Sequence, residues 1–300
     1  MSLPATETLT DSKVIDAIPA LEAVDLMLNV QVDALGAVRK AGPALVLGAD
    51  CMAKAIRSKN SIIYVAAGSS GLMALADACE LPGTFGISPD LVKIHMAGGV
   101  PVDGRMPGAT EDDTKAAKDV ARSVSPGDAL IVLSASGTTP YALQAALSAK
   151  ERGATVIGIA NNRDAPLLEH SDVAIHLETP SEVIAGSTRM GAGTAQKVAL
   201  NLMSSLMGAN LGHVYQGMMV NLVADNAKLT KRAAYIVSHI ASVSQDEADR
   251  ALRQSNGHVK TAILVAGGLS PSAASTLLNT YYGHLGPCLQ SLSSNQDAIE

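Results

Sequence analysis

The sequence of 300 residues contains no tryptophan and only one phenylalanine. Sites that bind sugars or bases by stacking need aromatic faces, so a bound carbohydrate would have to be held by polar groups. Lysines and arginines are scattered along the chain, and the net charge is -6. Because a nucleic-acid backbone binds to clustered basic side chains, we expect no nucleic-acid partner.

Long apolar segments are also missing. No run of about 18 apolar residues occurs, and the N-terminus has no basic stretch followed by an apolar stretch and a cleavage site. These absences predict a cytoplasmic protein without membrane contact. The three cysteines, Cys51, Cys79 and Cys288, are far apart, and the seven histidines lack metal-ligand spacing. We therefore expect reduced, buried thiols and no bound metal.

Short β-branched segments alternate with longer helical segments between Ser61 and about His176. This alternation is typical of an α/β fold with a parallel sheet that helices cover on both faces. We therefore predict a doubly wound, five-stranded parallel sheet, for which the fold class implies the strand order 2-1-3-4-5. The predicted strands are Ile62–Ala66, Leu91–Met96, Ala129–Leu133, Thr155–Ile159 and Val173–Leu177.

Helical segments flank the predicted sheet on both sides. Residues 17–57 are apolar at helical spacing, and Gly42 and Pro43 divide them into two N-terminal helices. Beyond the sheet, the pattern predicts one long helix over 188–211 and another over 218–229. A small C-terminal helical bundle follows, with helices over 233–241, 245–254 and 259–267, a further helix near 270–278, and Ser244 as an N-cap. We predict a first domain over 1–230 and the bundle over 231–300.

Two loops rich in glycine and hydroxyl groups follow the first and third predicted strands. They are Gly68-Ser69-Ser70-Gly71 and Ser136-Gly137-Thr138-Thr139. Glycines let the backbone approach an anion, hydroxyls donate hydrogen bonds, and the following helix N-terminus favours negative charge. In the expected strand order both loops flank the switch point where ligands bind. The pair predicts a phosphate site, and the missing nucleotide fingerprints disfavour a nucleotide.

Three glutamates lie near these loops, and each has an ordinary structural explanation as well as a functional one. Glu80 is near the end of a helix that begins at Gly71, which the following proline and glycine end. A carboxylate is electrostatically disfavoured there, which suits a general acid, although a solvated carboxylate explains it too. Glu111 fits the acidic first turn of a helix with Thr110 as N-cap. Glu182 follows the fifth strand and could be a simple loop residue.

These segments, in this order, resemble the sugar isomerase domain family and, within it, the bacterial N-acetylmuramic acid 6-phosphate etherases. The resemblance covers most of the chain and extends into the helical tail at Lys260-Thr261-Ala262-Ile263. The matching stretches are residues 66–71, 77–86, 97–99, 108–112, 136–141 and 189–197.

The resemblance implies a homodimeric enzyme without a metal or other cofactor. Such an enzyme cleaves the D-lactyl ether of N-acetylmuramic acid 6-phosphate to N-acetylglucosamine 6-phosphate and D-lactate, during recycling of cell-wall amino sugars. The aldehyde of the open-chain sugar acidifies the C2 proton, lactate leaves from C3, and water adds to the resulting double bond. The resemblance implies that Glu80 and Glu111 are the catalytic glutamates and that Glu182 binds a sugar hydroxyl or assists ring opening.

The chain departs from the family pattern at three places. Leu72, Thr138 and Gly191 stand where the family usually has basic residues. A charge-assisted contact contributes about 1.5 to 3 kcal/mol, so we expect weaker attraction of the usual, doubly anionic substrate. Two other functions therefore stay open. An aldose–ketose phosphosugar isomerase needs the same loops and one base, whereas a non-catalytic phosphosugar-binding regulator needs neither glutamate.

Overall fold

The computed structural model describes residues 4–9 and 14–296. By its internal contacts the chain forms two compact units. The first comprises the residues up to Ala78 together with Asp90–Leu206, and the second comprises Cys79–Pro89 together with the chain from Met207 onward. The domain boundary that we predict after residue 230 thus falls inside the second unit.

The first unit contains a five-stranded parallel sheet with the order β2-β1-β3-β4-β5, which confirms the predicted fold class. Every residue of the two central strands, β1 and β3, is buried. Continuous apolar segments are what a strand needs when helices cover both of its faces. The strands are β1 (Ile62–Ala66), β2 (Val92–Met96), β3 (Ala129–Leu133), β4 (Thr155–Ala160) and β5 (Val173–His176).

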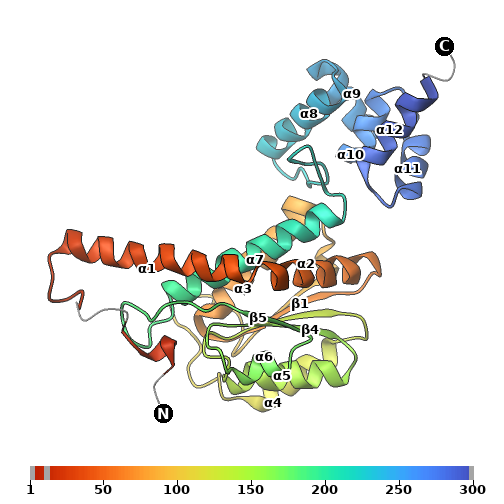
Figure 1. Ribbon diagram of the computed structural model, residues 1–300. Helices are drawn as coiled ribbons and strands as arrows, with labels where there is room; N and C mark the ends of the chain where they lie inside the picture. The colour runs from red at the N-terminus through yellow and green to blue at the C-terminus, as the bar shows by residue number, and fades with distance from the viewer. Residues whose placement is uncertain (1–3, 10–13, 297–300) are drawn as a thin grey trace. The chain divides into compact units, whose positions relative to one another are not determined.

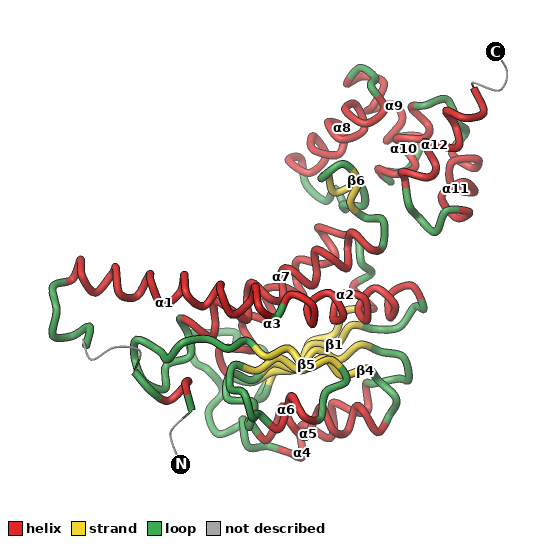
Figure 2. The backbone as a smooth tube through the Cα atoms, viewed as in Figure 1, coloured by secondary structure: helices red, strands yellow, loops and turns green. Residues whose placement is uncertain are grey.

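Helices cover both faces of this sheet (Figures 1 and 2). One face carries α4, α5 and α6, and the other carries α2 and the long helices α3 and α7, while α1 extends from the start of α2 away from the sheet. Small side chains such as Ala145 and Ala149 let α5 pack closely on the strand residues Val65 and Val132. The helices are α1 (Ala20–Lys40), α2 (Gly42–Arg57), α3 (Gly68–Phe85), α4 (Thr114–Val120), α5 (Pro140–Glu151), α6 (Pro166–Glu169) and α7 (Gly191–Asn210), with short 3-10 helices at Ala5–Glu7, Pro89–Leu91 and Ala121–Ser123.

The second unit is a helical bundle, and most of its predicted helices are present. Ser244 caps α9 with a capping box, as predicted. The helix predicted over 218–229 is wrong, because Gln216 and Gly217 have positive φ and form the turn of a short hairpin. The elements are β6 (Val214–Tyr215), β7 (Met218–Met219), α8 (Ala227–Ala241), α9 (Gln245–Gln254), α10 (Val259–Ala266), α11 (Pro271–Thr280) and α12 (Leu285–Gln296).

Helix α3 differs from its prediction at both ends. It begins at Gly68 instead of Gly71 and continues through Pro82 to Phe85. The carbonyl oxygens near its end find partners within the second unit, since Val223 N–H donates to Gly83 O at 3.2 Å and Asn221 Nδ2 donates to Phe85 O at 2.9 Å. These bonds stabilise the helix beyond the proline.

The cysteine prediction is correct only in part. All three thiols are free, but Cys79 is exposed on α3, Cys51 is partly buried and Cys288 is buried. In the part of the chain that the structure describes, no group of three His, Cys, Asp or Glu side chains could hold a metal ion. No single described helix is long and apolar enough to cross a membrane, although α10 and α11 together, bent by 116°, meet that criterion of length and composition.

His213 in the second unit makes stability depend on pH. Burial, and then the nearby charge of Lys260, lower its pKa to about 4. Between that value and 6.5 the unfolded chain binds a proton that the folded unit does not, so stability falls as pH drops through this range. We expect a loss of about 2 kcal/mol between pH 8 and pH 5 in urea unfolding. His213→Gln should remove this loss, whereas His239→Gln, at an exposed position on α8, should leave it unchanged.

Candidate active site

A cavity of about 180 Å³, here called the phosphate-loop pocket, lies at the carboxyl ends of β1 and β3. The two predicted loops form most of its wall, and an N-terminal segment and the turn after β5 complete it. The lining residues are Thr6, Glu7, Ala67, Gly68, Ser69, Ser70, Glu111, Leu133, Ser134, Ala135, Ser136, Thr139, Gly186 and Thr188. Six predicted site residues therefore meet here, and they are Gly68, Ser69, Ser70, Glu111, Ser136 and Thr139.

Glycine is needed where the first loop turns into α3. Gly68 has a φ of +55°, and a Cβ atom there would lie 2.8 Å from Glu111 Oε1. Gly71 lies one turn later, where a Cβ atom would lie 2.9 Å from the side chain of Met96. The glycines thus allow Glu111 and the strand-end residue Met96 to approach the helix start, which places a carboxylate beside the hydroxyl loop.

The loop after β3 is held in shape by its own hydroxyls. Gly137, with a φ of +72°, donates its N–H to Ser134 Oγ at 3.0 Å, and Ser134 Oγ lies 2.8 Å from Thr139 Oγ1. Thr138 donates its hydroxyl to Ser136 Oγ at 3.0 Å. This network fixes a cluster of neutral hydroxyls at one wall of the pocket, which suits a phosphate group without a cation.

Glu111 is not part of a helix, contrary to its predicted position in a first turn. The N-cap of α4 is Asp113, whose side chain accepts from the N–H groups of Lys115 and Ala116, and the helix begins at Thr114. The Glu111 carbonyl accepts from Tyr141 N–H at 2.9 Å, which fixes the segment against the start of α5. The carboxylate of Glu111 is therefore not used for capping and lies at the phosphate-loop pocket.

The N-terminal segment contributes Thr6 and Glu7 to the pocket. Thr6 O accepts from Gly186 N–H at 3.1 Å, and Thr6 Oγ1 accepts from Asn162 Nδ2 at 3.1 Å. Glu182 N–H donates to Thr8 O at 3.2 Å. The segment is polar and aperiodic, so its sequence pattern predicts no role for Glu7.

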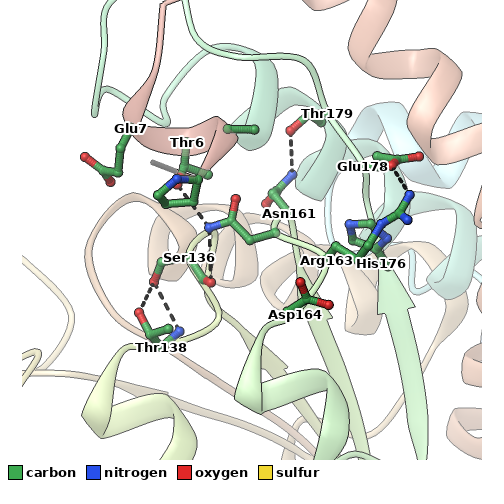
Figure 3. A pocket seen from close by; sticks show the side chains of 13 residues that line it. Thr6, Glu7, Ser136, Thr138, Asn161, Arg163, Asp164, His176, Glu178 and Thr179 are labelled. Carbon is green, nitrogen blue, oxygen red and sulfur yellow. Dashed lines mark hydrogen bonds and ion pairs between the residues drawn. The ribbon is translucent and has the colours of Figure 1, made fainter. Parts of the chain in front are cut away.

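A second cavity of about 520 Å³, here called the Arg163 pocket, shares Thr6, Glu7 and Ser136 with the first. Figure 3 shows Thr6 and Glu7 on one side of it and Arg163 with Glu178 on the other. Its lining residues are Pro4, Ala5, Thr6, Glu7, Ser136, Thr138, Asn161, Asn162, Arg163, Asp164, His176, Glu178 and Thr179.

Arg163 is the one lysine or arginine among the described residues that line the two cavities. Its Nη2 donates to Glu178 Oε1 at 2.6 Å, and this bond holds the pKa of Glu178 below its usual value. Lys40 Nζ lies 3.7 Å from the other oxygen of Glu178. Because Glu178 has two cationic partners, Arg163 can turn toward an anionic ligand without leaving that carboxylate unpaired.

Other predicted site residues lie elsewhere. Glu182 is buried, and its two carboxylate oxygens accept from Gly191 N–H at 3.1 Å and Ala192 N–H at 2.9 Å, at the start of α7. It serves as a helix cap and lines neither cavity. Glu80 is exposed on α3 and lines neither cavity. Gly71 and Gly137 belong to the loops but line neither cavity.

The sheet order and the hydroxyl loops are those expected of a protein with a SIS domain. The model of the SIS domain matches residues 33–161. Among solved structures, a phosphoheptose isomerase from Francisella tularensis matches with a TM-score of 0.51 and 19% identity over 64% of this chain and 100% of that chain. A putative phosphosugar isomerase involved in capsule formation from Bacteroides fragilis gives 0.52 and 20% over 66% and 95%. These structures show the same fold.

Curated relatives define the family more narrowly. The N-acetylmuramic acid 6-phosphate etherase of Deinococcus radiodurans is 40% identical over 85% of this chain and 84% of its own length. The enzyme of the same name from Photorhabdus laumondii is 35% identical over 93% of both chains. The chain belongs to the N-acetylmuramic acid 6-phosphate etherase family.

Proposed function

We propose that the protein is a carbon–oxygen lyase that removes the D-lactyl group from N-acetylmuramic acid 6-phosphate, in the cytoplasmic recycling of cell-wall amino sugars. The observation that carries this proposal is the family membership together with Glu111 beside the hydroxyl loops. A carboxylate at the phosphate-loop pocket supplies the acid or base that a lyase needs and a binding protein does not need.

The chemistry needs little beyond positioned donors and carboxylates. Hydroxyls of the two loops bind the phosphate, which places the sugar beside Glu111. A carboxylate removes the C2 proton, the electrons form the C2–C3 double bond, and the C3–O bond breaks as the lactate oxygen takes a proton. Water then adds at C3 and a proton returns to C2. Glu111 serves one of these proton transfers, and Glu80 serves another.

Incubation with N-acetylmuramic acid 6-phosphate in deuterated water tests this proposal. We expect NMR to show release of D-lactate together with deuterium at C2 of the product. Conversion of an aldose phosphate to its ketose without lactate would instead indicate an isomerase. Tight binding without turnover would indicate a regulator.

We propose that the active form is a homodimer. Leu21, Val24, Leu28, Val32 and Leu35 are 76%, 51%, 56%, 55% and 44% exposed and follow one another at three, four, four and three residues along α1. This spacing forms the apolar seam of a paired helix. Glu80 lines neither cavity of its own chain, and we propose that a second copy supplies Glu80 to the site.

Charge on this seam should dissociate the dimer. We expect Leu28→Glu combined with Val32→Glu to give a monomer in light scattering, because two carboxylates would be buried at the helix contact. The control Val102→Glu, at a position that is 100% exposed, should stay dimeric. A wild-type protein that is already monomeric at micromolar concentration would contradict the proposal.

Arg163 should attract the anionic substrate. Because it is the one lysine or arginine among the described residues of the two cavities, we expect Arg163→Gln to raise the KM for N-acetylmuramic acid 6-phosphate about tenfold, with little change in kcat. Lys40→Gln is the matched control, since Lys40 contacts the same Glu178 but lines neither cavity. Equal effects of the two substitutions would show that only the Glu178 contact matters.

A further inference from the structure

A chain of buried side-chain hydrogen bonds connects the two cavities. Ser70, which lines the phosphate-loop pocket, donates its hydroxyl to Gln196 Oε1 at 2.8 Å. Gln196 Nε2 donates to Asn161 Oδ1 at 3.0 Å. Asn161, which lines the Arg163 pocket, donates its Nδ2 to Leu177 O and to Thr179 Oγ1, both at 3.3 Å. Ser70, Gln196 and Asn161 are 7%, 1% and 2% exposed.

The direction of this chain is fixed at its far end. The carbonyl oxygen of Leu177 can only accept a hydrogen bond, so the amide nitrogen of Asn161 must face it. Asn161 Oδ1 then faces Gln196 and must accept from Nε2, which leaves Gln196 Oε1 to face Ser70. That oxygen can only accept, so the single hydroxyl proton of Ser70 points away from the pocket.

From this geometry we infer that Gln196 is a positioning residue that makes Ser70 a hydrogen-bond acceptor toward the ligand. The inference rests on the proposed function and corrects the expectation that Ser70 donates to the phosphate. Ser69, Ser136 and Thr139 remain as hydroxyls that can donate. The ligand group placed at Ser70 must itself carry a hydrogen, which is a sugar hydroxyl, the N–H of the acetamido group or the P–OH of a singly charged phosphate.

A double-mutant cycle tests whether Gln196 acts through Ser70. We expect Ser70→Ala and Gln196→Met each to raise the Kd of N-acetylglucosamine 6-phosphate about tenfold in calorimetry. In the Ser70→Ala background, Gln196→Met should add less than about twofold, because the residue it positions is gone. Additive effects would overturn the inference.

Two further variants separate positioning from folding. Gln196→Glu keeps a side-chain oxygen that can accept from Ser70, so it should bind the sugar phosphate more tightly than Gln196→Met does. Gln144→Met is the matched control, since Gln144 Nε2 donates to Ser148 Oγ at 2.9 Å on α5 and lines neither cavity. It should not change the Kd. Binding by Gln196→Glu that is no tighter than by Gln196→Met, with its melting temperature intact, would overturn the inference.

The pH dependence of the Ser70→Ala effect identifies the ligand group. The second pKa of a phosphate monoester is about 6. If Ser70 accepts from P–OH, Ser70→Ala should raise the Kd more at pH 5.5 than at pH 7.5. If Ser70 accepts from a group of the sugar itself, the increase in Kd should be the same at both pH values. An increase in Kd that becomes larger as pH rises would mean that Ser70 donates to the phosphate dianion, which would overturn the inference. Wild-type protein that binds no sugar phosphate contradicts both this inference and the proposed function, whereas lactate release with additive effects contradicts the inference alone.

Discussion

Replacing Glu111 by glutamine is expected to lower the kcat for lactate release by about 10²- to 10⁴-fold, the range for losing a positioned acid or base. The amide has the same shape, and the backbone bond from Tyr141 N–H to Glu111 O does not involve the side chain. The KM should therefore change little. Asp112→Asn is the matched control, because Asp112 is an exposed neighbouring carboxylate that lines neither cavity. Full lactate release by Glu111→Gln would refute the proposed role.

Glu80→Gln should lower the kcat for lactate release about as much as Glu111→Gln does. Mixing the two variants tests where Glu80 acts. If each site uses Glu111 from one copy and Glu80 from the other, a heterodimer of Glu80→Gln with Glu111→Gln has one intact site. After subunit exchange the mixture should recover about a quarter of the wild-type activity per site. No recovery, with exchange verified by mass spectrometry, would place both glutamates in one chain, whereas full activity of Glu80→Gln alone would remove Glu80 from the chemistry.

The sheet could be predicted because its strands are continuous apolar segments. Ile62–Ala66 and Ala129–Leu133 are buried on both faces, and their predicted and observed bounds agree. The hydroxyl loops could be placed because they directly follow these strands, and the carboxyl ends of neighbouring parallel strands meet at one edge of the sheet. The helix predicted over 218–229 is wrong because the apolar residues of this segment favour a helix, whereas the turn just before it, at Gln216 and Gly217, starts the second strand of a hairpin.

The remaining parts of the site depend on contacts between distant segments. Gln196 lies 126 residues from Ser70, in a helix whose composition indicates only packing. Glu182 follows a strand at the expected edge, but its burial under the first turn of α7 turns it into a cap. Glu7 is placed by backbone pairing of an aperiodic segment, as the bond from Gly186 N–H to Thr6 O shows. No local pattern encodes such contacts.

Asp77→Ala is expected to destabilise the first unit by about 3 to 5 kcal/mol, because each buried donor left without its acceptor costs about 1 to 3 kcal/mol. Asp77 is 3% exposed. It accepts hydrogen bonds from Tyr64 Oη at 2.8 Å, Asn201 Nδ2 at 2.8 Å and Ser204 Oγ at 2.9 Å. Burial, and then Asp77 itself, hold the pKa of Tyr64 well above its usual value. Loss of the carboxylate leaves three donors without this acceptor.

Asp77 and its three hydrogen-bond partners join β1, α3 and α7. Tyr64 lies on β1, Ser70 on α3 and Gln196 on α7. Urea unfolding followed by circular dichroism should show the full loss for Asp77→Ala and a smaller one, about 1 to 2 kcal/mol, for Tyr64→Phe. Asp119→Ala is the control, since Asp119 pairs with Arg122 at an exposed position and should cost less than about 1 kcal/mol. If Asp77→Ala costs no more than this control, the three donors find other acceptors, and the packing of α3 and α7 on β1 does not depend on the carboxylate.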